Sequence, residues 1–454
     1  MDIKFKLFLG TLAILPITIY FIALLDPLAI FSFLFVFILA FLLHKLFFGS
    51  FSKDIFINYV YYAFFAVCLA YFHFFLYGEY FDLGGNPLKI GGDDLRYSIE
   101  ALTGISCRAS HDTLLPFSKF LHIFPVIFSL YKEPTHIDLL LVNILAISFI
   151  PIFVSRFSDL MFSAKQIKNV SYVISLFCPF LLINSVILYR DGWIAFFFIG
   201  ALYFFYKKNY FFTFVFLIGE LYFRLGSGLL LSFFILMLWI RQFLLSKNYL
   251  ETKVIMILSS IIVGVIFLVV IFPYLDQYVT SKLGGNLFFR KDFLDKHLLS
   301  VTSNQGVSSG MVALYSAPFP IRFLGGILFF LVAPIFSLNY LYSIHGIFWI
   351  KQAIVLIFPF LMLFYIAWFI RGLIYAISRK DHNVLILYII YFFSIVIISQ
   401  ISLQIRHKVM LMPLFYVLVA YGFCFKTKIG TQLGIISSLG LFFLQFFYLL
   451  SKAL

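Results

Sequence analysis

The sequence predicts an all-α polytopic integral membrane protein of about 12–14 transmembrane helices, with two long extracytoplasmic loops. Of its 454 residues, 63% are hydrophobic and 11% are charged, whereas about a quarter of the residues in a soluble domain carry charge. Apolar runs of roughly 17 residues or more, long enough to cross a bilayer, recur along the whole chain. No polar stretch between them is long enough for a soluble core, so residues 1–454 are expected to form a single membrane domain.

The apolar runs define the predicted spans in chain order. The first run has a basic start but no small-residue cleavage site before Asp26, so we expect a retained span and not a cleaved signal peptide. Runs 192–206 and 210–224 are short, which predicts tilted or broken helices. We interpret 322–340 as a re-entrant element or paired half-helices, broken at Pro334. The predicted spans lie near 6–25, 28–48, 55–77, 137–155, 169–189, 192–206, 210–224, 226–245, 253–275, 352–370, 384–402, 409–425 and 432–450.

The positive charges predict how these spans are oriented in the membrane. With a cytoplasmic N-terminus, the short basic connections fall inside, as the positive-inside rule requires. The first external loop, 78–136, and the second, 276–321, then lie outside, and long loops are usually functional. The active face is therefore predicted to be extracytoplasmic. The charges assigned to it are Asp93, Asp94, Arg96, Arg108, Arg190, Asp191, Arg224, Arg290, Arg322, Arg406, His407 and Lys408.

An acidic pair stands in the first external loop, within the run Gly-Gly-Asp-Asp-Leu-Arg-Tyr at 91–97. Two neighbouring carboxylates beside a bilayer suit the deprotonation of a hydroxyl or the binding of a divalent metal. Asp93 and Asp94 are therefore the predicted catalytic residues. Arg96 could pair with them or with a phosphate, and Tyr97 is a candidate substrate contact. The alternative is a solvated loop that uses Asp and Gly for turns.

Two arginines are candidates for gripping a diphosphate. Arg190 and Asp191 stand at the outer end of one predicted span and directly before the next, where an arginine can make forked contacts to phosphate. The alternative is an interfacial anchor that pairs with its neighbour. Arg224 follows Glu220 by one helical turn, so a structural ion pair between these two residues is the alternative there.

A third cationic group lies near the C-terminus. Arg406, His407 and Lys408 form the densest external cluster and precede Pro413, which opens a span. Three cations at the mouth of a helical bundle predict a site for lipid phosphate. The alternative is a cytoplasmic basic loop, which would change the topology.

Other motifs exclude several functions. The four cysteines show neither metal-binding spacing nor a disulfide framework. There is no P-loop and no glycine-rich dinucleotide motif after a strand, so a nucleotide-sugar donor is not expected. No nucleic-acid partner is expected either.

Three motifs resemble enzymes of polyprenyl-linked glycan assembly. Gly92-Asp93-Asp94-x-x-Tyr97-x-x-x-Ala101 resembles the acidic first-loop motif of GT-C glycosyltransferases. The run Tyr189-Arg190-Asp191-Gly192-Trp193-Ile194-Ala195, followed by Lys207-Lys208 and Arg224, resembles a block of O-antigen and exopolysaccharide polymerases. The Arg406-His407-Lys408 cluster with Pro413 is similar to a late element of both groups. The matches cover roughly 78–230 and 400–425, and the chain lacks the soluble C-terminal domain of GT-C enzymes.

The resemblance implies an O-antigen or capsular polysaccharide polymerase. Such an enzyme would join undecaprenyl-diphosphate-linked repeat units, with Asp93 or Asp94 as base and Arg190, Arg224 and Arg406 on the diphosphate. Its partners would be the lipid-linked oligosaccharide, membrane lipids and a candidate chain-length regulator. One alternative is a GT-C transferase that adds a single sugar from a polyprenyl monophosphate. Another is a flippase, which should carry its charges along a central cavity and expose only short loops.

The topology is testable by cysteine labelling in intact cells. Cysteines introduced within 78–136 and 276–321 should react with a membrane-impermeant thiol reagent, because these ranges are predicted to be external. Cysteines introduced within 200–210 and 371–383 should react only after the membrane is opened. Labelling of a cysteine at position 380 from outside would contradict the orientation.

Overall fold

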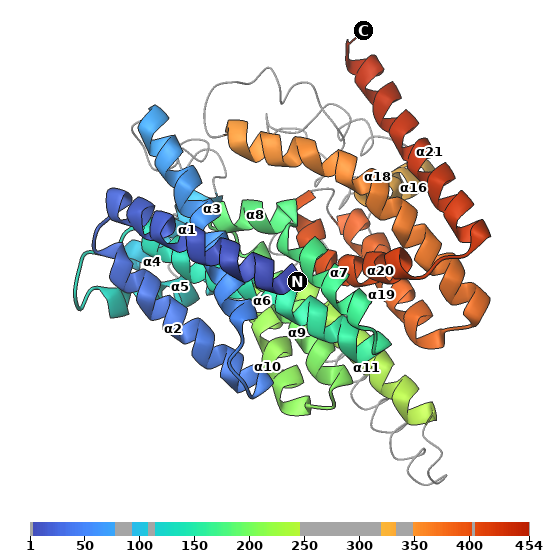
Figure 1. The fold of residues 1–454 in the computed structure, drawn as a ribbon, viewed down its shortest axis with the longest axis horizontal. Coiled ribbons are helices and arrows are strands. Elements are labelled where there is room, and N and C mark those ends of the chain that lie inside the picture. Colours follow the sequence, from blue (N-terminus) through green and yellow to red (C-terminus); the bar gives the residue numbers. More distant parts are fainter. Residues whose placement is uncertain are drawn as a thin grey trace. The chain divides into compact units, whose positions relative to one another are not determined.

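The computed structural model describes residues 3–77, 93–107, 114–245, 319–332, 348–401 and 405–453. Every regular element in these ranges is helical (Figure 1). Nine of the described helices are long and apolar enough to cross a membrane, or ten if one bent pair counts as a span. The all-helical, multi-pass prediction is confirmed to that extent. The count of 12–14 spans and the two long loops stay predictions, because they include residues outside the described ranges.

The helices follow the apolar runs of the sequence closely. Their bounds are α1 (Ile3–Leu25), α2 (Ala29–Phe48), α3 (Lys53–Tyr77), α4 (Asp93–Thr103), α5 (Pro116–Phe128), α6 (His136–Phe162), α7 (Lys165–Leu176), α8 (Pro179–Val186), α9 (Asp191–Tyr206), α10 (Tyr210–Phe223), α11 (Leu225–Leu245), α16 (Phe319–Val332), α18 (Phe348–Arg379), α19 (His382–Ile401), the 3₁₀ helix η2 (Ile405–Leu411), α20 (Met412–Cys424) and α21 (Lys428–Ala453).

The chain divides into two compact units. The first comprises Met1–Gly228, Val332–Ser394 and Gln404–Leu454, and the second comprises Leu229–Leu331 and Ile395–Leu403. The second unit contains α16 and most of α11. The contacts described below lie within the first unit.

Helix α6 is the centre of the first unit. It packs against α3, α7, α9, α2 and α20, and its membrane-spanning stretch is entirely buried. A helix that is apolar on all sides belongs in such a position. Several of its buried polar groups bond to neighbouring helices, because a bilayer supplies no water to them. The Asn143 amide donates to the carbonyls of Asn184 and Ile187 at 2.8 and 3.3 Å, and the Ser148 carbonyl accepts from Asn58 at 2.7 Å.

The predicted span 169–189 is not continuous. The structure breaks it into α7 and α8, which are bent by 43° at Phe177 and Cys178. The sequence reason is Pro179, which has no N–H and forces the preceding residue out of the helical region. Cys178 accordingly has φ −63° and ψ 118°. Its thiol accepts a hydrogen bond from the Tyr416 hydroxyl at 3.0 Å, which ties the break to α20.

Helices α9 and α10 are short, as the sequence predicts. With 16 and 14 residues they are about 24 and 21 Å long, against about 30 Å of hydrocarbon. They pack closely on each other. A Cβ atom on Gly200 would lie 2.1 Å from the Phe216 ring, and one on Gly219 would lie 2.4 Å from the Phe197 ring. Glycine is therefore required at both positions for this approach.

A buried ion cluster closes one end of the first unit. The Lys132 ammonium lies 2.5 Å from the Asp26 carboxylate and 2.7 Å from that of Asp138. The Thr135 hydroxyl also donates to Asp26, at 3.1 Å. The cluster joins the α1–α2 turn to the start of α6. Burial raises the pKa of the Asp26 carboxyl, but Lys132 and Thr135 outweigh burial, so this pKa lies below its ordinary value.

Replacing Lys132 by Met should lower the unfolding free energy by about 3 kcal/mol, because Asp138 would stay buried without its counter-ion. Thermal unfolding in detergent measures this change. The exposed Lys165, replaced by Ala, is the matched control and should have little effect. An unchanged midpoint in Lys132→Met would contradict the role of the cluster.

The same cluster predicts a direction for the pH dependence. Because the folded-state pKa of Asp26 is lowered, its contribution to stability is present above the unfolded-state pKa of about 3.9. The contribution is lost as the pH falls through the folded-state pKa. The difference between wild type and Lys132→Met should therefore shrink at acid pH.

Candidate functional site

The site is built around an ion pair between two interhelical turns. Asp191 is the first residue of α9, and Arg224 directly follows α10 with an extended backbone (φ −154°, ψ 100°). The Arg224 Nη1 lies 3.0 Å from the Asp191 Oδ1, and the two side chains are 21% and 6% exposed. Residues 33 positions apart in the chain are thereby held together at one end of the α9–α10 pair.

The sequence also offered a pairing of Arg224 with Glu220, one helical turn before it. The helix ends at Phe223, and the Arg224 backbone N–H bonds the Glu220 carbonyl at 2.8 Å. The guanidinium forms its hydrogen-bonded ion pair with Asp191. Its charge also acts on the buried Glu220 carboxyl, so the structure adds a partner to the local pair and does not remove it.

Arg190 binds the backbone at the end of α10. Its Nη1 donates to the Phe223 carbonyl at 3.4 Å, while its neighbour Asp191 is engaged by Arg224. The alternative in which Arg190 pairs with Asp191 is thus not what the structure shows. A guanidinium has five N–H donors, and this carbonyl is the one acceptor of Arg190 among the described residues. Most of its donors remain for an anionic ligand.

Aromatic rings connect this turn to the first external region. The Phe223 ring lies 5.5 Å from Phe117 and 5.2 Å from Phe120, both in α5. Phe117 in turn meets Tyr97 of α4 edge-on at 5.0 Å. Tyr97 is 2% exposed, so its ring holds α4 in place. Region 78–136, expected as a loop, therefore contains two helices that pack toward the ion pair.

The predicted catalytic pair occupies the first turn of α4. The helix begins at Asp93, and Asp94 follows, one turn before Tyr97 and Ser98. Carboxylates in a first helical turn also stabilise the helix through its dipole. This stabilisation is the structural alternative to the predicted catalytic role of Asp93 and Asp94. The side chains of both residues lie outside the described part of the chain. Their catalytic role and a divalent metal there stay predictions; among the described side chains no three potential ligands gather.

The remaining contacts of α4 involve residues that sequence reasoning missed. Glu100 is fully buried and accepts from the Ser118 hydroxyl at 2.5 Å. The Ser98 hydroxyl bonds His136 Nδ1 at 2.8 Å, which joins α4 to the start of α6. One sequence signal could have identified Glu100: it is a carboxylate three residues after Tyr97, on the apolar face of a short amphipathic helix.

The late cationic cluster, Arg406, His407 and Lys408, lies beside α9, the helix that begins at Asp191. It belongs to η2, which packs against α9 and α8 and leads into α20. Lys408 is fully buried, and His407 is half-buried. Of Arg406 only the backbone is described. An entirely buried ammonium cannot be an open phosphate site, so the prediction now depends on its two neighbours.

Two other charged residues complete the account of the predicted site. Arg96 lies over the Tyr97 ring, 4.9 Å from its centre. Arg322 belongs to α16 of the second unit, and its side chain lies outside the described part of the chain. Within the first unit, the structure thus brings together Arg190, Asp191 and Arg224, and aromatic rings link them to α4.

Comparison with known proteins adds no family to this geometry. No protein-family model, curated protein or solved structure matches the chain. Function must therefore be inferred from the residues and their contacts.

The ion pair can be tested with a double-mutant cycle on unfolding free energy. Asp191→Asn and Arg224→Gln should show a coupling of about 1–2 kcal/mol, because each side chain binds the other directly. The cycle of Asp191→Asn with Arg190→Gln is the matched control and should show less coupling, since Arg190 binds a backbone carbonyl. Equal coupling in both cycles would favour the pairing of sequence neighbours.

Proposed function

We propose that this chain is a membrane glycosyltransferase that polymerises undecaprenyl-diphosphate-linked oligosaccharide repeats at the extracytoplasmic face of a bacterial inner membrane. One observation carries the proposal. Arg190 and Arg224 both meet the turn at Phe223, and that residue packs through Phe117 onto the helix that begins with Asp93 and Asp94. This chain of ring contacts is what supports assigning the candidate diphosphate-binding cations and the candidate bases to one site.

The chemistry follows from these residue types. The acceptor hydroxyl oxygen attacks the anomeric carbon of the donor sugar, and Asp93 or Asp94 takes the hydroxyl proton. The bond from that carbon to the lipid diphosphate breaks, and its electron pair leaves with the diphosphate. Arg190 and Arg224 hold the developing negative charge through charge-assisted hydrogen bonds. The donor is already activated, so no nucleotide is needed.

The short helices support a site at the depth of a lipid-linked diphosphate. Helix α9 is about 24 Å long and ends next to the exposed Lys207 and Lys208. If these lysines lie at one membrane surface and the helix follows the membrane normal, Asp191 lies about 6 Å below the opposite surface of a 30 Å hydrocarbon layer. A diphosphate on a membrane-embedded carrier can reach that depth.

The distribution of charge supports an enzyme over a flippase. Between Asp138 and Arg156 the central helix α6 carries no ionisable side chain. The described ion pairs cluster at the two ends of the first unit: Lys132 with Asp26 at one end, and Lys168 with Asp159, 2.6 Å apart, at the other. Transport of a charged glycan would call for charges along the path between the ends.

The proposal is tested by complementing a gene deletion with variants and separating the surface polysaccharide on a gel. The deletion strain should show one repeat unit per lipid anchor and no ladder of chain lengths. Asp93→Asn and Asp94→Asn, singly or together, should restore less than about a tenth of the polymer while the protein stays in the membrane, because a general base contributes at least a hundredfold.

Asp159→Asn is the matched control, because this half-exposed carboxylate lies at the opposite end of α6. It should restore the full ladder. A wild-type ladder in the double Asp93/Asp94 variant would overturn the carboxylate mechanism. A ladder that persists in the deletion strain with one sugar missing would favour a single-sugar GT-C transferase.

A further inference from the structure

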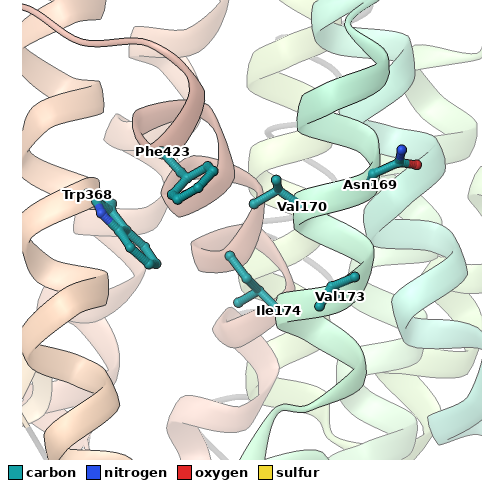
Figure 2. A pocket seen from close by; sticks show the side chains of 6 residues that line it. All are labelled: Asn169, Val170, Val173, Ile174, Trp368 and Phe423. Atoms are coloured by element: carbon teal, nitrogen blue, oxygen red, sulfur yellow. The ribbon is translucent and has the colours of Figure 1, made fainter. Parts of the chain in front are cut away.

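A second feature of the first unit lies away from the proposed catalytic end. It is an apolar groove with a volume of about 240 Å³ between α7, α18 and α20. Figure 2 shows Val170 and Ile174 of α7 pointing across the gap toward Trp368 of α18 and Phe423 of α20. Val173 and Asn169 complete the lining. The walls are therefore hydrocarbon and aromatic rings, contributed by elements that lie in the membrane.

One end of this groove carries a guanidinium. Arg371 follows Trp368 by one turn of α18, and it donates from Nε to the Gly422 carbonyl and from Nη2 to the Phe423 carbonyl, both at 2.5 Å. It thus caps the last turn of α20, where carbonyls have no helical partner. Because Phe423 lines the groove, the positive charge lies at its wall. Three of the five guanidinium N–H donors are left over.

Two lysines flank the same end. Lys165 begins α7, one turn before Asn169, and Lys426 lies just beyond α20; both are exposed. Neither forms an ion pair with a residue in the described ranges. Ring contacts show that these ends of the helices meet, since Phe162 lies 4.8 Å from Tyr421, and Tyr375 lies 5.0 Å from Phe425.

We propose that this groove binds an anionic phospholipid, with one acyl chain between α7 and α18 and the phosphate at Arg371, Lys165 and Lys426. The apolar walls match a hydrocarbon chain, and the cations at one end match a phosphate. Basic pockets between membrane helices on the cytoplasmic side bind anionic headgroups in this way. The predicted topology places this end in the cytoplasmic leaflet, where anionic lipids provide the ligand. The inference is independent of the proposed enzymatic activity.

Trp368 is a built-in reporter of the groove. Full-length protein is reconstituted in phosphatidylcholine nanodiscs that contain increasing fractions of phosphatidylglycerol with brominated acyl chains, which quench tryptophan on contact. The difference between wild type and Trp368→Phe isolates the Trp368 signal. We expect half-quenching at a several-fold lower fraction of brominated phosphatidylglycerol than of brominated phosphatidylcholine. Equal quenching by the two lipids would overturn the proposal.

Variants separate the headgroup contact from the chain contact. Arg371→Gln and the Lys165→Ala/Lys426→Ala pair should each raise the half-quenching fraction of phosphatidylglycerol several-fold, toward that of phosphatidylcholine, because each loses attraction to the anionic headgroup. The lysine pair keeps the test valid if Arg371→Gln does not fold.

Ile174→Phe, which fills the groove, should abolish the preference for phosphatidylglycerol. Ile436→Phe is the matched control on the exposed face of α21, where the side chain is 62% exposed, and it should leave the preference unchanged. Loss of the preference in the control, or its persistence in both the lysine pair and Ile174→Phe, would contradict a specific site.

Discussion

The low dielectric of the bilayer is the constraint on which the first unit depends, because an unpaired charge there costs several kcal/mol. The central helix α6 obeys it by carrying its ionisable residues only near its ends. One of its interior polar groups, the Asn143 amide N–H, donates to the Asn184 carbonyl of a neighbouring helix. Lys132 then closes one end of the unit by binding two carboxylates at once. Chemistry that needs charge is confined to the two ends.

The candidate site arises where two helices stop short of a full span. Gly200 and Gly219 let α9 and α10 approach closely, so the start of one helix and the end of the other are adjacent. Each helix end leaves backbone groups without a helical partner. Arg190 satisfies the Phe223 carbonyl at one such end, while Arg224 pairs with Asp191 at the other. The contacts that supply partners to the two helix ends therefore also place the guanidinium groups of Arg190 and Arg224 close together.

Arginine serves two different tasks at the two ends of the unit. Near α9 the guanidinium groups lie beside packed aromatic rings of α5 and can act on a substrate, as the proposed polymerase requires. Near α20 the Arg371 guanidinium first secures the final carbonyls of a helix. Its remaining donors are the ones that the proposed lipid phosphate would use. In both places a planar fork of donors binds backbone carbonyls while keeping donors for an anion, which an ammonium cannot do in the same way.

The sequence by itself determined the helical class, the positions of most of the long apolar helices that the structure describes and the shortness of α9 and α10, because apolar run length reports directly on membrane burial. It also drew attention to Arg190, Asp191 and Arg224. Only the tertiary structure decided that Arg224 forms an ion pair with Asp191, since that contact depends on where α10 ends and how it packs on α9. The break before Pro179 and the helices within 78–136 were likewise invisible to run length. Partners far apart in the chain are selected by packing, which local spacing does not encode.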